Sequence, residues 1–349
     1  MAHVATITID HTKVPGDLTD YVGLIVPDGS AGYSALYALC LEGGGDIRLF
    51  KSDDTTELAR EIVTFSVSSE TGEIHYRYAG TLSSSVDTDI HVYADGSSSE
   101  PAASATYGSE AVWVDYELVS HDGGGTDSAG NYTPSANGGV TIGGATGKIG
   151  NATDFDGSND YIDLGNLRLI TSESNTHSVS MWFQWDATNG VVDYIYSSSS
   201  GSNDRATINI DTRAGQEYFS ASVYDGSFAG KSAPQTDLDF VNYFHTAYSY
   251  NASLGSIDVW LNSTALTGTE STGTSSDTHS NISGRANGDF LFNGRTDEFR
   301  VRESVYAANW ITTEYNNQNA NGSFWEATDA GGGGSTPAQA ARRGAVMMM

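Results

Sequence analysis

The sequence predicts an all-β protein built from two antiparallel β-sandwich domains and a flexible C-terminal tail. Three observations support this fold class. Many short stretches alternate between apolar and polar residues with a period of two, as half-buried strands do. The 40 glycines provide for many tight turns, and the 19 tyrosines suit strand faces. Helical stretches are nearly absent, and the best candidate covers residues 305–315.

The predicted strands and turns follow one another in a regular order. The clearest alternation covers residues 74–78, 90–93 and 179–185. Clusters of Gly, Ser, Asn and Asp separate such stretches, for example at 95–97 and 197–201. These residue types supply positive φ angles and side-chain-bonded turns, which a β-sandwich needs between its strands.

The length and a change in composition predict where the domains lie. A chain of 349 residues exceeds the usual span of one hydrophobic core. Small, polar and Pro residues at 97–111 separate two strand-rich regions. We therefore expect an N-terminal β-sandwich at 1–110, a second β domain at 111–327, and a Gly-rich linker and tail at 328–349.

The charge excludes one class of partner. Lys and Arg total 16 and Asp and Glu total 44, so the formal net charge is −28. Such a surface repels phosphate backbones, and nucleic acid is not an expected partner. Cation binding, solubility in salt and repulsion between copies on a crowded surface all fit this charge. Calcium is the natural cation to consider.

The cysteine content and the N-terminal residues further limit the class of protein. Cys40 is the single cysteine, so the chain forms no internal disulfide and no cysteine-based zinc cluster. The N-terminal residues show neither a secretory signal nor a transmembrane helix. An extracellular role then fits a mature fragment, or a virion component that is assembled in the cytoplasm and freed by lysis. We favour the virion component.

Four ordered segments carry a resemblance to a known family. Residues 147–165, 177–187, 242–264 and 292–318 contain, in turn, F-D-G-x-x-D-Y, a strand with a Trp, a strand ending in an N-x-x turn, and G-x-x-D-E-x-R-V before a helical turn. This series resembles the laminin-G-like modules of the concanavalin-A-like lectin superfamily. The resemblance implies that residues 111–327 form a jelly roll.

The first hundred residues resemble another domain type. Residues 44–62 and 72–96 are similar to a β-domain of unknown function found upstream of laminin-G-like modules. That resemblance implies a second antiparallel sandwich and no known chemistry.

A metal site is one interpretation of the Asp-rich turn around Gly157. Asp156, Asn159 and Asp160 crowd oxygen atoms there, and such a group either caps its own turn amides or holds a hard cation. An Asx-type turn capped by Asp156 and a structural calcium ion remain equally open. Laminin-G-like modules often carry one calcium ion at a sheet edge, and the resemblance implies Asp297 as the further ligand.

Three aromatic residues are candidates for glycan binding. Trp182 is opposite in phase to the neighbouring Phe183, so an exposed Trp182 would stack on a sugar ring. A loop position for Tyr132 or Trp325 would allow the same contact. The alternative for aromatic residues in such a chain is packing in the core.

Catalytic motifs are not found in the sequence. It contains no HExxH, GxSxG or phosphate-binding loop, and its eight histidines are scattered, so a buried zinc site is not predicted. Glycanases of this fold place carboxylates on alternate residues of one strand. Asp297 and Glu298 are adjacent and predicted to face opposite sides, and Asp237 and Asp239 lie in a predicted loop. We expect a protein that is not an enzyme.

These observations favour a virion structural or adhesion protein, such as a bacteriophage capsid decoration or tail component, whose lectin-like domain binds host glycans. The location would be a virion surface or otherwise extracellular, with multimeric assembly and no membrane insertion. The tail either frays or docks on a neighbouring subunit, and its docking residues would be Arg342, Arg343, Met347, Met348 and Met349. The alternatives are a secreted or surface-anchored bacterial carbohydrate-binding adhesin module and a polysaccharide hydrolase or lyase.

Overall fold

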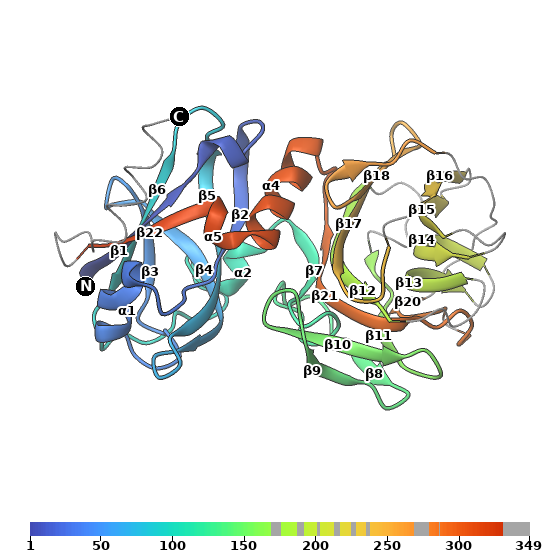
Figure 1. Ribbon diagram of the computed structural model, residues 1–349, viewed down its shortest axis with the longest axis horizontal. Coiled ribbons are helices and arrows are strands. Elements are labelled where there is room, and N and C mark those ends of the chain that lie inside the picture. The colour runs from blue at the N-terminus through green and yellow to red at the C-terminus, as the bar shows by residue number, and fades with distance from the viewer. Residues whose placement is uncertain are drawn as a thin grey trace.

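The computed structural model shows two lobes of antiparallel β structure with one main helix between them (Figure 1). It describes residues 1–168, 176–186, 192–200, 203–212, 217–224, 228–234, 238–268, 279–285 and 287–330. The predicted all-β class with antiparallel sheets is confirmed. None of the helices within these residues has the length and apolar character needed to cross a membrane.

The first lobe is built on a seven-stranded sheet. Its strands are β1 (Ala2–Ile9), β2 (Leu18–Ile25), β3 (Arg48–Lys51), β4 (Glu57–Ser66), β5 (Thr71–Leu82), β6 (Thr88–Ala94) and β22 (Trp325–Asp329). The order across the sheet is β2-β5-β4-β3-β6-β1-β22. Short helical segments accompany it: η1 (His11–Lys13), η2 (Ala31–Tyr33), α1 (Ser34–Leu39) and α2 (Ser109–Val112).

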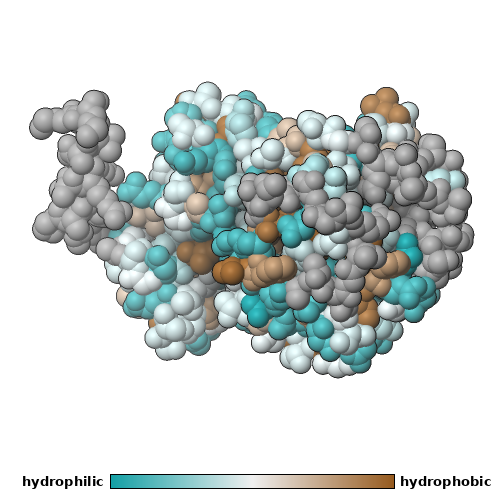
Figure 2. Space-filling view, turned by 45° about the vertical axis from the view of Figure 1, so that its right-hand side comes forward, coloured by the Kyte–Doolittle hydropathy of each residue, from teal (hydrophilic) through white to brown (hydrophobic). Residues whose placement is uncertain are grey.

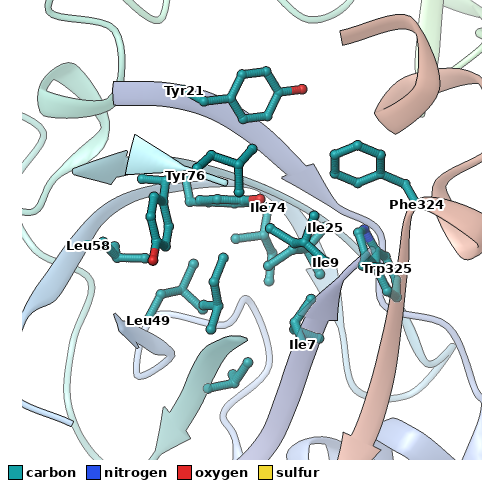
Figure 3. Close-up of a cluster of buried hydrophobic side chains, with 14 of the residues drawn as sticks. Ile7, Ile9, Tyr21, Ile25, Leu49, Leu58, Ile74, Tyr76, Phe324 and Trp325 are labelled. Atoms are coloured by element: carbon teal, nitrogen blue, oxygen red, sulfur yellow. The ribbon is translucent and has the colours of Figure 1, made fainter. Parts of the chain in front are cut away.

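Along the first-lobe strands, every second side chain points into a common core. In β1, Ile7 and Ile9 are buried and pair with β6 residues, Ile7 opposite Ile90. Figure 3 shows Ile7 and Ile9 together with Trp325, which comes from the far end of the chain. Cys40 packs in the same core, and burial raises the pKa of its thiol to about 12.

The strand β22 corrects the predicted domain boundary. Trp325–Asp329 pairs antiparallel with β1, from Ile9 opposite Trp325 to Ala5 opposite Asp329. A boundary between 327 and 328 would divide this strand. The chain therefore leaves the first lobe, forms the second and returns, because the unpaired edge of β1 offers backbone groups that β22 satisfies.

The second lobe consists of two facing sheets, as a jelly roll requires. The first has the order β19-β18-β17-β12-β21-β10-β9, with β7 also paired to β21, and the second has the order β16-β15-β14-β13-β20-β11-β8. The strands of the first are β7 (Tyr116–Ser120), β9 (Thr141–Thr146), β10 (Asn151–Asp156), β12 (His177–Trp185), β17 (Tyr243–Asn251), β18 (Ser256–Leu261), β19 (Thr264–Ala265) and β21 (Asn293–Arg302). Those of the second are β8 (Ser135–Asn137), β11 (Tyr161–Gly165), β13 (Val192–Ser200), β14 (Asn203–Asp211), β15 (Tyr218–Tyr224), β16 (Phe228–Pro234) and β20 (His279–Ile282).

The core of the second lobe lies between these two sheets. Phe183 of β12 stacks on Phe219 of β15 with the ring centroids 5.7 Å apart. Val179 and Met181, in phase with Phe183, are fully buried in the same core. The opposite face of β12 therefore points toward the first lobe.

The helix α4 (Ala308–Asn319) lies between the lobes and is followed by α5 (Asn321–Phe324) (Figure 1). The predicted helix at 305–315 exists but begins and ends a few residues later. Trp310 and Ile311 pack in the first-lobe core, whereas Glu314 faces the second lobe, where it contacts His245 of β17. One helix thus covers faces of both lobes.

Candidate functional site

The predicted calcium ligands of the Asp-rich turn form an Asx-type turn. Asp156 Oδ1 accepts hydrogen bonds from the backbone N of Ser158 at 2.8 Å and of Asn159 at 3.3 Å. Asp160 Oδ2 accepts from the backbone N of Asp156 at 3.3 Å. The self-capping interpretation thus describes this turn. Calcium binding there stays a prediction confined to Asp156, Asn159 and Asp160.

Asp297 does not join that turn, which corrects the predicted ligand group. In the β10–β21 ladder Asp156 lies opposite Asn293, and Asp297 comes four residues later, a distance of about 13 Å along a strand. Asp297 is fully buried, and its Oδ2 accepts from the backbone N of Ile149 at 2.8 Å. The two strands are adjacent, as the resemblance implied by naming Asp297 a ligand, but their register separates the side chains.

Two of the predicted sugar-stacking residues are buried. Trp182 is 1% exposed, and its Nε1 donates to Gln318 Oε1 of α4 at 2.6 Å. Trp325 is 7% exposed, and its Nε1 donates to the carbonyl of Leu24. The prediction that these rings are sugar platforms is wrong, because each ring fills the space between packed elements.

The remaining predicted site residues are Tyr132 and the residues of the tail. Tyr132 is half-buried, and its hydroxyl donates to Glu117 at 2.5 Å and accepts from the backbone N of Arg168. The predicted docking residues of the tail, Arg342, Arg343, Met347, Met348 and Met349, lie outside the described residues, and so does Asp237.

A β-bulge overturns the expectation that Asp297 and Glu298 face opposite sides. Asp297 lies opposite Trp182 and Arg300 lies opposite Ser180, so three steps along β21 span two steps along β12. Glu298 takes a positive φ of 52°. Both carboxylates therefore lie on the outer face of the sheet, toward the first lobe. Bulges re-aim side chains in this way, often at functional sites.

The interface between the lobes contains a cluster of buried ionisable side chains, which we call the interdomain cluster. The first lobe contributes residues from β4 and β5, and the second contributes residues from β17, β21 and the segment after β7, with α4 between them. Its members are Glu61, Glu73, His75, His121, His245, Glu298, Arg300 and Glu314.

His121 is at the centre of one half of the interdomain cluster. Its Nδ1 lies 2.9 Å from Glu298 Oε1, and its Nε2 lies 3.1 Å from Glu61 Oε2. The ring stacks on that of His75, with centroids 4.3 Å apart. His75 Nε2 lies 3.1 Å from Glu73 Oε1 and 3.8 Å from Glu298 Oε1.

Arg300 forms the other half. Its guanidinium bonds to Glu298 through Nη2 and lies 3.3 Å from Glu314 Oε2 through Nη1. Glu314 Oε1 in turn lies 3.0 Å from His245 Nε2. All four side chains are at most 2% exposed. Ionisable groups from two strands and one helix thus meet away from water.

The pKa values of the interdomain cluster follow burial and charge. Burial alone would lower the pKa of His121, but the carboxylates of Glu298 and Glu61 raise it well above its usual range. Burial lowers the pKa of His75, with His121 adding repulsion. Burial and the nearby charge of Glu298 raise the pKa of Asp297 well above its usual range. His121 therefore favours its charged form, whereas His75 and the neighbouring Asp297 favour their neutral forms.

Sequence reasoning missed this cluster because it looked for histidines close together in the chain. The ligand-type residues come from separate strands that only the fold brings together. One local signal was present. Glu73 and His75 are two residues apart on a strand, and residues at that spacing share one face.

Comparisons with known proteins give likenesses of fold only. No protein-family model matches the chain, and no curated protein matches it. The receptor-binding domain of the botulinum neurotoxin C/D mosaic serotype aligns with a TM-score of 0.46 and 15% identity, over 59% of this chain and 52% of that one. The type G receptor-binding domain aligns with a TM-score of 0.43 and 12% identity, over 58% and 51%.

A third solved structure aligns with this chain over almost its whole length. Domain 4 of AbnA, an extracellular GH43 arabinanase from Geobacillus stearothermophilus solved with arabinotriose, aligns with a TM-score of 0.41 and 20% identity. The alignment covers 57% of this chain and 98% of that domain. This chain spans only about half the length of the toxin domains.

Proposed function

We propose that this protein is a non-enzymatic, lectin-like binding protein whose jelly roll contacts carbohydrate with its exposed end. The observation that carries the proposal is the turn at Asp239–Asn242, before β17, which presents an aromatic ring to solvent. Phe240 is 49% exposed and the neighbouring Val241 is 76% exposed. An exposed aromatic face beside polar groups is the arrangement that stacks on a sugar ring.

The turn is held in a defined shape. Asp239 Oδ1 accepts from the backbone N of Val241 at 2.9 Å and of Asn242 at 2.6 Å. The inner side of the Phe240 ring lies against buried Trp185, with centroids 4.9 Å apart. A ring fixed before binding loses little conformational freedom on contact with a ligand.

Asn242 and nearby polar side chains would read the sugar hydroxyls. Asn242 Nδ2 donates to Asp239 Oδ2 at 2.6 Å, which orients the amide. Gln184, next to Trp185 on β12, is buried under the turn and supports it from below, since its Nε2 lies 3.5 Å from the Phe240 carbonyl and its Oε1 accepts from Arg295 at 3.2 Å. Amide, carboxylate and guanidinium groups together offer both donors and acceptors to hydroxyl groups.

A matched pair of substitutions tests this proposal. The full chain, immobilised at high density so that weak contacts add up, is assayed for retention of a panel of polysaccharides. Phe240→Ala is expected to weaken the retained interaction by about tenfold or more, which corresponds to about 1.4 kcal/mol. Leu254→Ala is the control, because Leu254 is also apolar and 74% exposed but lies in the β17–β18 turn.

Two results would contradict the carbohydrate proposal. One is that no polysaccharide of the panel is retained by the wild-type chain. The other is that Phe240→Ala and Leu254→Ala bind equally well. Release of shorter sugars from a retained polysaccharide would instead support the hydrolase or lyase alternative.

We also propose that the protein belongs to a virion, as a capsid decoration or tail component, and that it is a laminin-G-like display protein. The net charge of −28 supports this, because it keeps neighbouring copies apart on a crowded surface. Figure 2 shows such a polar surface, on which apolar residues form small groups among hydrophilic ones. Antibodies against the chain are expected to label virus particles. Labelling of bacterial cell surfaces instead would support the adhesin alternative.

A further inference from the structure

We propose that the interdomain cluster binds one divalent transition-metal ion of the Zn²⁺ class and thereby fastens the two lobes together. The ligands are Glu73 and His75 of β5, His121 after β7, and Glu298 of β21. The ion would be structural, and this site is separate from the proposed sugar contact at Phe240.

The distances fit a small metal ion. The four ligand atoms, His75 Nε2, Glu73 Oε1, His121 Nδ1 and Glu298 Oε1, all lie within 4.8 Å of one another. Taken in order around the ring they form, they are separated by 3.1, 3.8, 2.9 and 3.8 Å. Metal–ligand bonds of about 2.0–2.1 Å in a tetrahedron place neighbouring ligand atoms about 3.3–3.4 Å apart. The cluster is thus close to a coordination shell before any side chain moves.

The ligand types select the metal. Two imidazoles and two carboxylates suit Zn²⁺ and related transition metals, whereas Ca²⁺ and Mg²⁺ favour sets of oxygen atoms. Four protein ligands in a buried position are typical of a closed structural site rather than a catalytic one.

The residues that contact the proposed ligands are also of the kind found around metal centres. His121 reaches Glu61 Oε2 at 3.1 Å through Nε2, the ring nitrogen that faces away from Glu298. Ser128 also donates to Glu61, at 2.6 Å. A carboxylate behind a histidine ligand fixes the ring and strengthens its bond to the metal.

His75 directs one ring nitrogen, Nε2, into the interdomain cluster. The ring is fully buried, and its Nδ1 has no hydrogen-bond partner among the described residues. Its other nitrogen is directed into the cluster, at 3.1 Å from Glu73 and 3.8 Å from Glu298. A bound cation would contact Nε2, and Nδ1 lies outside the proposed ligand set.

The charge balance of the interface also calls for a cation. Glu73, Glu298 and Glu314 are buried with the guanidinium of Arg300, which is shared between Glu298 and Glu314, and each also lies beside a histidine. Glu61 adds a further carboxylate, 14% exposed. Buried carboxylates are costly unless they are paired or bind metal. A divalent ion between Glu73 and Glu298 would offset part of this negative charge.

A second group of ligand-type residues in the first lobe provides an internal comparison. Asp10, His11 and Asp87 also place their atoms close together. The side chains of His11 and Asp87 are 36% and 54% exposed, however, and they bond directly to each other at 2.7 Å. This surface group serves as a control for adventitious binding.

The proposal is tested on the full chain with Zn²⁺ itself. The protein is stripped with a chelator, dialysed and titrated with Zn²⁺ by calorimetry, and its metal content is measured by mass spectrometry. We expect one tightly bound ion per chain and a rise in Tm that a chelator reverses. Replacement by Co²⁺ is expected to give the visible absorption of a four-coordinate site.

Variants separate the site from its surroundings. Glu73→Gln and His75→Gln are expected to lose the tightly bound ion. Glu61→Gln is expected to keep it with affinity reduced by about 10–100-fold. His245→Gln is the matched control, since His245 is an equally buried histidine of the same cluster but lies outside the ligand set. It should retain one ion, as should Asp87→Asn.

The proposal is overturned if the stripped, folded wild-type chain binds no Zn²⁺. It is also overturned if Glu73→Gln binds as well as the wild type, or if only Asp87→Asn abolishes binding. Far-ultraviolet circular dichroism verifies folding of each variant. Because the wild-type titration needs no variant, misfolding of His75→Gln does not affect the test.

Discussion

The charge state and the ion pairs of Arg300 are set by its position between two buried carboxylates. It lies between Glu298 and Glu314, is about as buried as they are, and places its guanidinium 5.1 Å from the centroid of the Trp113 ring. Burial would lower the pKa of Arg300, but the two carboxylates raise it above its usual range. The pair of acids is tolerated at the interface because this cation lies between them.

Removal of this cation is expected to destabilise the protein. Arg300→Met leaves Glu298 and Glu314 buried without their guanidinium and should lower the free energy of unfolding by about 3–5 kcal/mol. Arg168→Met is the control. Its ion pair with Glu303 is exposed, at 60% and 45%, and such pairs contribute about 0–1 kcal/mol. Urea unfolding followed by fluorescence measures both, and equal midpoints would refute the argument.

Residue-scale prediction from the sequence failed where strand geometry is irregular. Alternation alone places Asp297 and Glu298 on opposite faces, and the bulge at Glu298 brings both to one face. Trp182 faces away from the sandwich core, as its phase predicted, but α4 covers that face and buries the ring. The face of the strand on which Trp182 lies follows from the local sequence. Whether that face is buried depends on α4, which is more than a hundred residues away.

At the scale of elements, α4 completes the exposed edge of a strand. The first-lobe sheet ends at β2, whose edge would otherwise offer unpaired backbone groups. Asn317 of α4 accepts from the backbone N of Leu24 at 2.8 Å and donates to its carbonyl at 2.9 Å. The side-chain amide thus acts as a neighbouring strand would.

Loss of this amide should weaken the attachment of the helix. Asn317→Ala leaves the buried N–H of Leu24 without its partner, whereas the Leu24 carbonyl still accepts from Trp325 and Asn321. The loss should lower the free energy of unfolding by about 1–3 kcal/mol. Asn319→Ala, on the same helix but exposed, should change it by about 0.5 kcal/mol or less. Chemical denaturation compares them, and hydrogen exchange at Leu24 should accelerate only in Asn317→Ala. Unchanged exchange there would count against the edge role.

The whole molecule buries many tyrosine hydroxyls, which makes its stability sensitive to alkali. Tyr76 lies in the first-lobe core and Tyr248 in the second, and burial raises the pKa of each hydroxyl above its ordinary value. Burial also raises the pKa of Tyr306. The folded state therefore keeps protons that the unfolded chain releases near pH 10.

This difference predicts cooperative alkaline unfolding. The stabilisation is complete below about pH 10 and is lost as the pH rises above it, because only the unfolded chain then gives up these protons. Tyrosinate absorbance from the buried rings should appear together with loss of near-ultraviolet circular dichroism. Complete tyrosine ionisation in a chain that keeps its circular dichroism would contradict the prediction.

The sequence by itself determined the all-β class, the adjacency of the strands that carry Asp156 and Asp297, and the helix near residue 310. The class and the helix follow from local alternation, turn residues and helical spacing, and the adjacency of the two strands is what the resemblance to laminin-G-like modules implied. Only the tertiary structure decided that Trp325 belongs to the first lobe, that Trp182 is covered, and that Glu73, His75, His121 and Glu298 meet. These outcomes depend on register, on a bulge and on the return of the chain to β1, and each joins residues far apart in the sequence, whose approach no local pattern encodes.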